Sequence, residues 1–132
     1  MTRRTGTERD TPLQGMWILV VDDEPLIALD LEETFREAGA QVIKTSTLHS
    51  AREAAENSDI SAAVLDFRLG NETAESVAEI LAGRGIPFIF YSGQSPPDHL
   101  RNKFRRARYL VKPVQQRVFV KTFLDMMRDA SL

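Results

Sequence analysis

Four short apolar segments of this chain are each followed by a polar residue that could take part in chemistry. Asp22 and Asp23 follow the segment MWILVV, and Asp66 follows AAVL. Ser92 follows PFIFY, and Lys112 follows YLV. Three carboxylates brought together repel one another, and a divalent cation relieves that repulsion. Oxygen ligands suit Mg²⁺, which commonly takes one or two protein carboxylates and keeps several waters.

A carboxylate flanked by Mg²⁺ and an ammonium group is a suitable setting for phosphoryl transfer, where catalysis is mainly positioning and charge stabilisation. The carboxylate of Asp66 can itself act as the nucleophile and form an acyl phosphate. Lys112 would supply the fixed positive charge, and the Ser92 hydroxyl could reach the new phosphoryl oxygens. The residue types therefore indicate a phosphoacceptor site that depends on Mg²⁺.

The elements that must position these residues alternate between strand and helix. Short runs rich in strand-forming residues predict strands over Met16–Val21, Gln41–Ser46, Ala62–Leu65, Pro87–Tyr91 and Tyr109–Val111. Helical spacing of apolar residues predicts helices beginning at Pro25, over Leu48–Asn57, from Ala74 to Gly83 and over Val114–Arg128. This alternation predicts an α/β fold, a doubly wound five-stranded parallel sheet with helices on both faces. In such a sheet all five polar residues meet at the carboxyl edge, where open α/β sheets place their sites.

Four motifs at these strand ends resemble the signatures of the bacterial two-component response-regulator receiver domain. They are VVDDEP (Val20–Pro25), AAVLDFRLG (Ala62–Gly70), FYSG (Phe90–Gly93) and YLVKP (Tyr109–Pro113). Their order and spacing match as well, and the resemblance covers about residues 16–130. It implies the flavodoxin-like strand order 2-1-3-4-5.

The resemblance also implies a role for each residue of the site. Asp66 would be the phosphoacceptor, Lys112 would pair with the phosphoryl group, and Ser92 and Tyr109 would be the switch residues. The Mg²⁺ ligands it implies are Asp66, Asp23 directly, Asp22 largely through water, and the backbone carbonyl of Arg68. The donor would be a phosphohistidine on a sensor histidine kinase or a histidine phosphotransfer protein.

Two features depart from the common pattern of that family. The string after Asp66 lacks the usual proline, and we expect the Arg68 side chain, together with Gln94, to influence the rate of dephosphorylation. Pro96 and Pro97 open the segment between the fourth and fifth strands, and we expect them to shorten or distort the fourth helix.

Composition limits the other functions that need consideration. The 132 residues suit one domain, which we place at 16–130 after a flexible lead-in at 1–15. The chain has no cysteine, no apolar run long enough for a membrane span and a net charge of −2. These features fit a cytoplasmic protein that binds neither membranes nor nucleic acid. A basic stretch remains between Arg101 and Arg108, which is either a solvated face or a docking surface for an acidic partner.

We therefore expect a stand-alone signalling module, not an enzyme, that acts through an unknown downstream protein. A homodimer through the fourth helix, fifth strand and last helix is one arrangement to expect, and the broad apolar stripe of the last helix favours a surface role for Val120 and Leu124. Three alternatives stay open. The chain could be a phosphate-independent interaction module (a pseudo-receiver), a fragment of a larger regulator, or a small phosphotransferase or hydrolase of the same topology.

Overall fold

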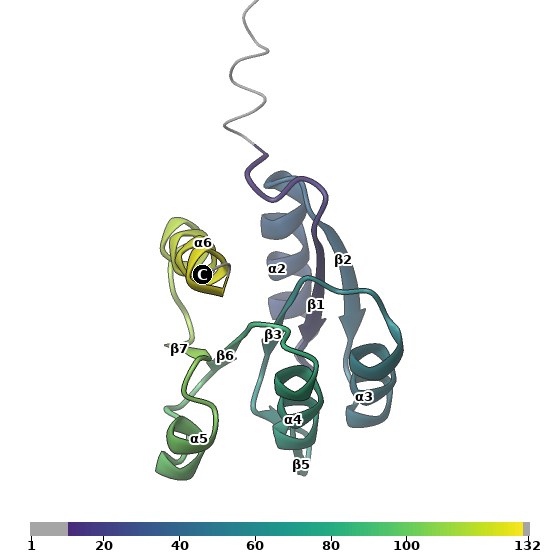
Figure 1. The fold of residues 1–132 in the computed structure, drawn as a ribbon, viewed down its shortest axis with the longest axis vertical. Coiled ribbons are helices and arrows are strands. Elements are labelled where there is room, and N and C mark those ends of the chain that lie inside the picture. The colour runs from purple at the N-terminus through teal and green to yellow at the C-terminus, as the bar shows by residue number, and fades with distance from the viewer. Residues whose placement is uncertain (1–10, 131–132) are drawn as a thin grey trace, which may run out of the picture.

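The computed structural model describes residues 11–130 and contains the predicted five-stranded parallel sheet (Figure 1). The strand order is β2-β1-β3-β6-β7, which is the predicted 2-1-3-4-5 order counted along the chain. The strands are β1 (Trp17–Val21), β2 (Gln41–Thr45), β3 (Ala62–Leu65), β6 (Phe88–Ser92) and β7 (Arg108–Val111). β1, β3 and β6 lie inside the sheet, and apart from the exposed Trp17 their residues are buried because helices cover both faces.

One face of the sheet is covered by α2 (Pro25–Glu37) and α6 (Gln116–Ala130). Pro25 begins α2, where its fixed φ suits the first helical turn. The buried ring of Phe35 on α2 packs edge-on against Phe119 and Phe123 of α6, with centroid distances of 5.8 and 5.0 Å. These contacts fix both helices against each other as well as against the sheet.

The opposite face is covered by three further helices (Figure 1). They are α3 (Leu48–Asn57), α4 (Glu75–Gly83) and α5 (Asp98–Lys103). Small residues such as Ala51, Ala55 and Ala78 are fully buried on this face, which allows α3 and α4 to lie close to the sheet. The expected helices on both faces are therefore confirmed.

The segment around the two prolines behaves as the sequence predicts. α5 contains only six residues, since Pro97 immediately precedes it and Phe104 follows it.

A two-stranded antiparallel hairpin, β4 (Arg68–Leu69) with β5 (Glu72–Thr73), follows the third strand and is absent from the prediction. Gly70 lies in its turn with φ +62°, a conformation that favours glycine.

The packed part of the chain begins before Met16, which corrects the predicted lead-in. Residues 1–10 lie outside the described residues, but residues 11–15 form a turn against the end of α2. Leu13 is buried, and its N–H donates to the carbonyl of Ala38 at 2.7 Å. Gly39 has φ +100°, and a Cβ there would lie 2.9 Å from Cβ of Thr11. Position 39 must therefore be glycine for the turn at 11–15 to pack against it. A single leucine gave too weak an apolar signal for this contact to be predicted.

The surface role expected for Val120 and Leu124 is only partly consistent with the structure. Both side chains are half-buried, and Leu124 packs against the core between α2 and α6. The more exposed apolar side chains near that face are Val118 and Val111.

Within residues 11–130 no helix has the length and apolar character needed to cross a membrane.

Candidate phosphoacceptor site

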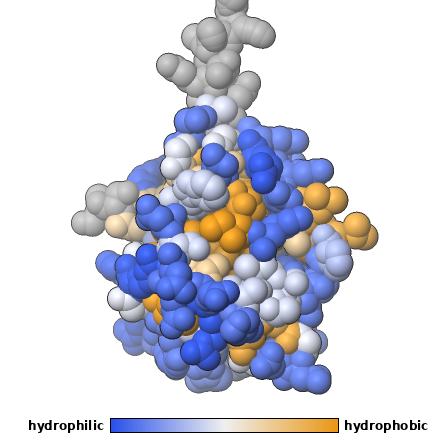
Figure 2. All heavy atoms as spheres, turned by 90° about the vertical axis from the view of Figure 1, so that its right-hand side faces the viewer, coloured by the Kyte–Doolittle hydropathy of each residue, from blue (hydrophilic) through white to orange (hydrophobic). Residues whose placement is uncertain are grey.

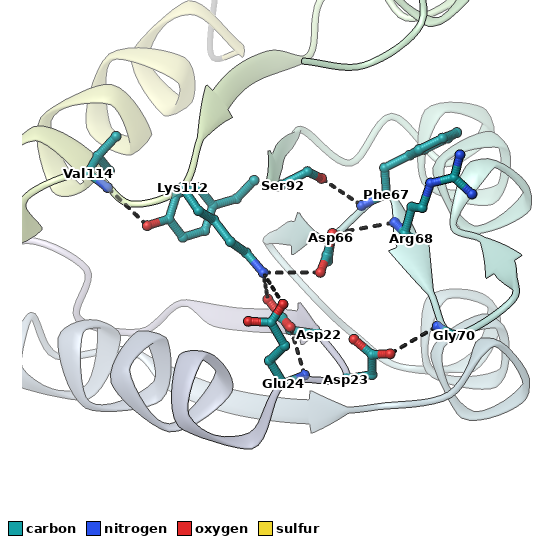
Figure 3. A network of polar contacts seen from close by, with 11 residues as sticks. Asp22, Asp23, Glu24, Asp66, Phe67, Arg68, Gly70, Ser92, Lys112 and Val114 are labelled. Carbon is teal, nitrogen blue, oxygen red and sulfur yellow. Dashed lines mark hydrogen bonds and ion pairs between the residues drawn. The ribbon is translucent and has the colours of Figure 1, made fainter. Parts of the chain in front are cut away.

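The predicted residues meet at the carboxyl edge of the sheet (Figure 3). Nζ of Lys112 lies 3.1 Å from Oδ2 of Asp66 and 2.9 Å from Oδ2 of Asp22. Asp22 and Asp66 are buried, with relative exposures of 2% and 6%. One ammonium group therefore pairs with two carboxylates that lie almost entirely away from bulk water. Glu24 contributes a third, more distant carboxylate at 3.6 Å.

Asp23 completes the acidic cluster from the solvent side. It is exposed, and its Oδ2 accepts a hydrogen bond from the N–H of Gly70 at 2.9 Å. One oxygen from each of Asp22, Asp23 and Asp66 lies within 4.8 Å of the other two. This all-carboxylate set has the spacing and the ligand type for one hard divalent cation. The donor set therefore fits the predicted metal.

Ser92 lies on the other side of Asp66 and holds the start of the loop that follows it. Its Oγ accepts a hydrogen bond from the N–H of Phe67 at 2.8 Å. The N–H of Arg68 approaches Oδ1 of Asp66 at 3.4 Å. The backbone after Asp66 is thus tied both to its own carboxylate and to the end of β6.

The ionisable groups of this site affect one another. Burial raises the pKa of Asp22, although hydrogen bonds from the Glu24 N–H and from Lys112 act in the opposite direction. Burial alone would lower the pKa of Lys112, but its hydrogen bonds to Asp22 and Asp66 outweigh burial and raise it. Lys112 is therefore a permanent positive charge at neutral pH.

A hollow of about 470 Å³ opens beside these groups. It is lined by Asp66 and Ser92, by the loop 93–97 and by residues of the β3–β4 connection. Gln94 and Arg68 both line it, as their predicted influence on the site requires. Figure 3 shows the Arg68 guanidinium directed away from the Asp66 carboxylate, so direct contact of this side chain with Asp66 is absent here.

Tyr109, the second predicted switch residue, is held on the inner side of β7. Its ring stacks on Phe90 at a centroid distance of 5.5 Å and an interplanar angle of 22°. Its hydroxyl donates towards the carbonyls of Phe104 at 2.7 Å and Leu100 at 3.1 Å. The guanidinium of Arg101, which lies on α5, is 4.6 Å from the centroid of the Tyr109 ring. Tyr109 therefore connects β6, β7 and α5.

The family described as the response regulator receiver domain matches residues 18–123. The chain belongs to this family. No curated protein sequence matches it.

Solved receiver domains share the fold. A response regulator receiver protein from Sinorhizobium medicae WSM419 has a TM-score of 0.80 at 24% identity, covering 89% of this chain and 98% of that one. The receiver domain of a sensor histidine kinase from Pseudomonas aeruginosa PAO1 has a TM-score of 0.72 at 23% identity, covering 86% and 98%. That structure has a magnesium ion coordinated in its active site cleft. A response regulator from Thermotoga maritima, solved in complex with Mg²⁺–BeF, has a TM-score of 0.72 at 22% identity, covering 84% and 98%.

Sequence reasoning missed several groups of this receiver domain's site. The Gly70 N–H that holds Asp23 and the Phe67 N–H that binds Ser92 are backbone donors, and residue types do not reveal them. Glu24 directly follows Asp22 and Asp23 in the sequence, and this position could have identified it as a member of the site. Tyr91 is a further missed residue, since its hydroxyl accepts from the N–H of Val114 at 3.2 Å and ties β6 to the segment leading into α6.

Proposed function

We propose that Asp66 of this receiver domain accepts a phosphoryl group in two-component signal transduction. One observation carries this proposal. At the carboxyl edge of the sheet, Nζ of Lys112 lies 3.1 Å from the Asp66 carboxylate and 2.9 Å from the Asp22 carboxylate. A buried carboxylate beside a fixed ammonium and two further carboxylates is arranged for acyl phosphate chemistry that needs a cation.

Mg²⁺ would be held by Asp23 directly, by Asp22 largely through water, by Asp66 and by the backbone carbonyl of Arg68. The carboxylate spacing supports this assignment, and so does the magnesium ion in the cleft of the Pseudomonas receiver domain. When bound, the cation neutralises charge on the transferring phosphoryl group and on the carboxylates around it. The Gly70 N–H keeps Asp23 in place at the rim for this purpose.

In the transfer step, a carboxylate oxygen of Asp66 attacks phosphorus of a phosphohistidine. The O–P bond forms as the N–P bond breaks, and the histidine imidazole leaves and takes up a proton. Lys112 remains within hydrogen-bond distance of the acceptor carboxylate and binds the phosphoryl oxygens. Because Lys112 stays protonated, it balances the added negative charge in the product.

Phosphorylation would then shift the population between two arrangements. Ser92 would exchange its hydrogen bond from Phe67 for one to a phosphoryl oxygen, and the loop after β6 would follow it. Tyr109 stacks on Phe90, two residues before Ser92 on the same strand, so a shift of that strand end reaches Tyr109 and α5.

Partner proteins would both deliver and read the phosphoryl group. Receiver domains act with histidine kinases or phosphotransfer proteins in two-component signalling. Leu26 at the start of α2 is 79% exposed and lies three residues after Asp23, so we place the donor protein over this side chain. The downstream partner, or a second copy of the chain, would meet α5, β7 and α6, where Val111 and Val118 are exposed. We place this signalling in the cytoplasm.

The direct test uses acetyl phosphate as a small acyl phosphate donor, with Mg²⁺ present. Intact-protein mass spectrometry should show one added phosphoryl group on the wild-type chain, and Asp66→Asn should show none. Asp59→Asn is the matched control, because Asp59 is exposed and precedes β3, whereas Asp66 follows the opposite end of that strand. A phosphoryl adduct on Asp66→Asn would refute the assignment.

A second measurement separates this function from a phosphate-independent interaction module. Addition of Mg²⁺, followed by beryllium fluoride, should shift the NMR signals of Asp23, Phe67 and Gly70 in the wild-type chain. Lack of any shift at these residues, together with lack of an adduct from acetyl phosphate, would favour the pseudo-receiver.

A further inference from the structure

A second hollow lies at the end of the sheet opposite Asp66. Its volume is about 410 Å³, and it is formed where β6 and β7 begin, whereas the site residues follow the strands' carboxyl ends. Its walls are the end of α4 with the turn 85–87, the α5–β7 connection 103–108, and the last turn of α6. It shares no lining residue with the hollow at Asp66.

The floor of this hollow is apolar and well packed. The side chains that form it are each less than 9% exposed: Ile86, Phe88, Phe104, Ala107 and Met126. The rings of Phe88 and Phe104 meet edge to face at a centroid distance of 5.7 Å, and the two residues are only 4% and 6% exposed, so they offer little surface for stacking a base. An occupant would gain binding energy by burying one aliphatic or aromatic side chain here.

The rim is strongly basic although the whole chain has a net charge of −2. Four basic residues and one acidic residue line the hollow: Lys103, Arg105, Arg106, Arg108 and Asp129. Lys103 pairs with Glu75 and Glu79, and Arg108 pairs with Asp129. Within residues 11–130 the guanidinium groups of Arg105 and Arg106 make no hydrogen bond or ion pair. Two cationic groups at the rim are therefore available to an external anion.

The segment that carries these two arginines is fixed on both sides. The Phe104 carbonyl before them accepts the Tyr109 hydroxyl, and the Arg108–Asp129 ion pair joins the start of β7 to the end of α6. Arg105 and Arg106 thus project from a preformed turn, and a partner that binds them loses less entropy than it would on a free loop.

We propose that this hollow binds an extended acidic segment of a partner protein, which inserts one apolar side chain into the floor. Consecutive carboxylates of such a segment would form bidentate contacts with Arg105 and Arg106. The apolar floor favours a peptide over a nucleic acid, because phosphates would match the rim but no base could stack on the covered rings. This docking surface shares no lining residue with the hollow at Asp66.

The test begins with selection of a displayed random-peptide library on the full chain. Peptides that combine acidic residues with an aromatic or large aliphatic residue should be enriched. The most enriched peptide, fluorescently labelled, is then titrated with each protein variant and followed by anisotropy. The double variant Arg105→Glu, Arg106→Glu should weaken binding at least tenfold.

Matched variants separate the site from general electrostatics. Arg52→Glu with Arg117→Glu makes the same change in net charge at exposed arginines of α3 and α6 that lie outside the hollow, and it should leave affinity unchanged. Ala82→Trp alters no charge but fills the hollow from an exposed helical position, and it should also abolish binding.

Three results would overturn the proposal. Enrichment of no acidic sequence would do so, and so would an enriched peptide that binds Arg105→Glu, Arg106→Glu as well as wild type. Displacement of the peptide by a single-stranded DNA oligonucleotide that binds more tightly would point to a nucleic-acid surface instead. NMR shifts at Ile86, Phe104 and Ala107 on peptide binding would locate the complex in the hollow.

Discussion

Nζ of Lys112 lies 3.1 Å from Oδ2 of Asp66, and both side chains are more than nine-tenths buried. The same nitrogen also contacts Asp22, so a single positive charge serves two carboxylates. Desolvation makes each buried ion costly on its own, and the arrangement is stable only while the opposite charges remain together. The charge balance of this site therefore contributes to folding as well as to chemistry.

Lys112→Ala should destabilise the metal-free chain, because it leaves Asp22 and Asp66 facing each other without a cation. We expect the free energy of unfolding at pH 7 to fall by about 3–5 kcal/mol in EDTA, with a smaller loss in millimolar Mg²⁺. Urea denaturation under both conditions measures this. Lys121→Ala removes an exposed lysine paired with Asp125 and should change stability far less, since surface ion pairs contribute little. Equal losses with and without Mg²⁺ would contradict the charge argument.

Mg²⁺ should stabilise the folded chain through the three carboxylates. At a concentration about 100-fold above the dissociation constant, a ligand of the folded state adds about 2.7 kcal/mol to the free energy of unfolding. Asp23→Asn should remove most of this gain, since Asp23 is the proposed direct ligand. Thermal unfolding across a Mg²⁺ titration gives the measurement, with Asp59→Asn as a control that retains the full response. A Mg²⁺ response of Asp23→Asn that matches wild type would show that the ion binds elsewhere.

Ser92→Ala should weaken the fold even before any phosphorylation. The Phe67 N–H would lose its acceptor at a buried position, at a cost of about 1–3 kcal/mol. Ser92→Thr keeps the hydroxyl and should recover most of the stability. Hydrogen exchange at the Phe67 amide provides a local readout, and it should quicken in Ser92→Ala alone. Unchanged exchange in that variant would mean that the hydrogen bond contributes nothing.

The sheet and the ends of its strands were predictable because buried parallel strands produce a strong local signal. Segments such as MWILVV and PFIFY are apolar throughout, and the polar residue after each one marks the strand's carboxyl end. The parallel topology then required Asp22, Asp66 and Lys112 to meet, although 90 positions separate the first from the last. The site was predictable because topology, and not local sequence, brings its residues together.

The parts that sequence did not predict depend on contacts between distant backbone groups. The β4–β5 hairpin has two residues per strand, too few for a period to be recognised. Leu13 is buried only because residues 11–14 turn back onto Gly39, a tertiary contact with no local pattern. Arg68 is the first residue of this hairpin, so the sequence pattern gave no basis for predicting the direction of its side chain.

Glu75 should make the stability of the chain depend on pH. Hydrogen bonds from Lys103 and then His99 lower the pKa of Glu75 below 4.5, so its stabilising contribution is present above that pH and is lost as the pH falls through the lowered value. Glu75→Gln should therefore cost about 0.5 kcal/mol at pH 7 and less than that at pH 3. Urea denaturation at the two pH values checks this, and Glu33→Gln, at an exposed position of α2, is the control. A larger cost at pH 3 than at pH 7 would reverse the sign and refute the assignment.

Tyr109→Phe should separate the two contributions of this side chain. The variant keeps the ring that stacks on Phe90 but removes the hydroxyl that donates to the carbonyls of Phe104 and Leu100. We expect a loss of about 0.5–1.5 kcal/mol in the free energy of unfolding, which is the usual net contribution of an intramolecular hydrogen bond. Amide exchange in α5 should quicken, since Tyr109 ties this six-residue helix to β7. Wild-type exchange in α5 would show that the Tyr109 hydroxyl does not hold the helix, and that its ion pairs to α4 and the buried Leu100 suffice.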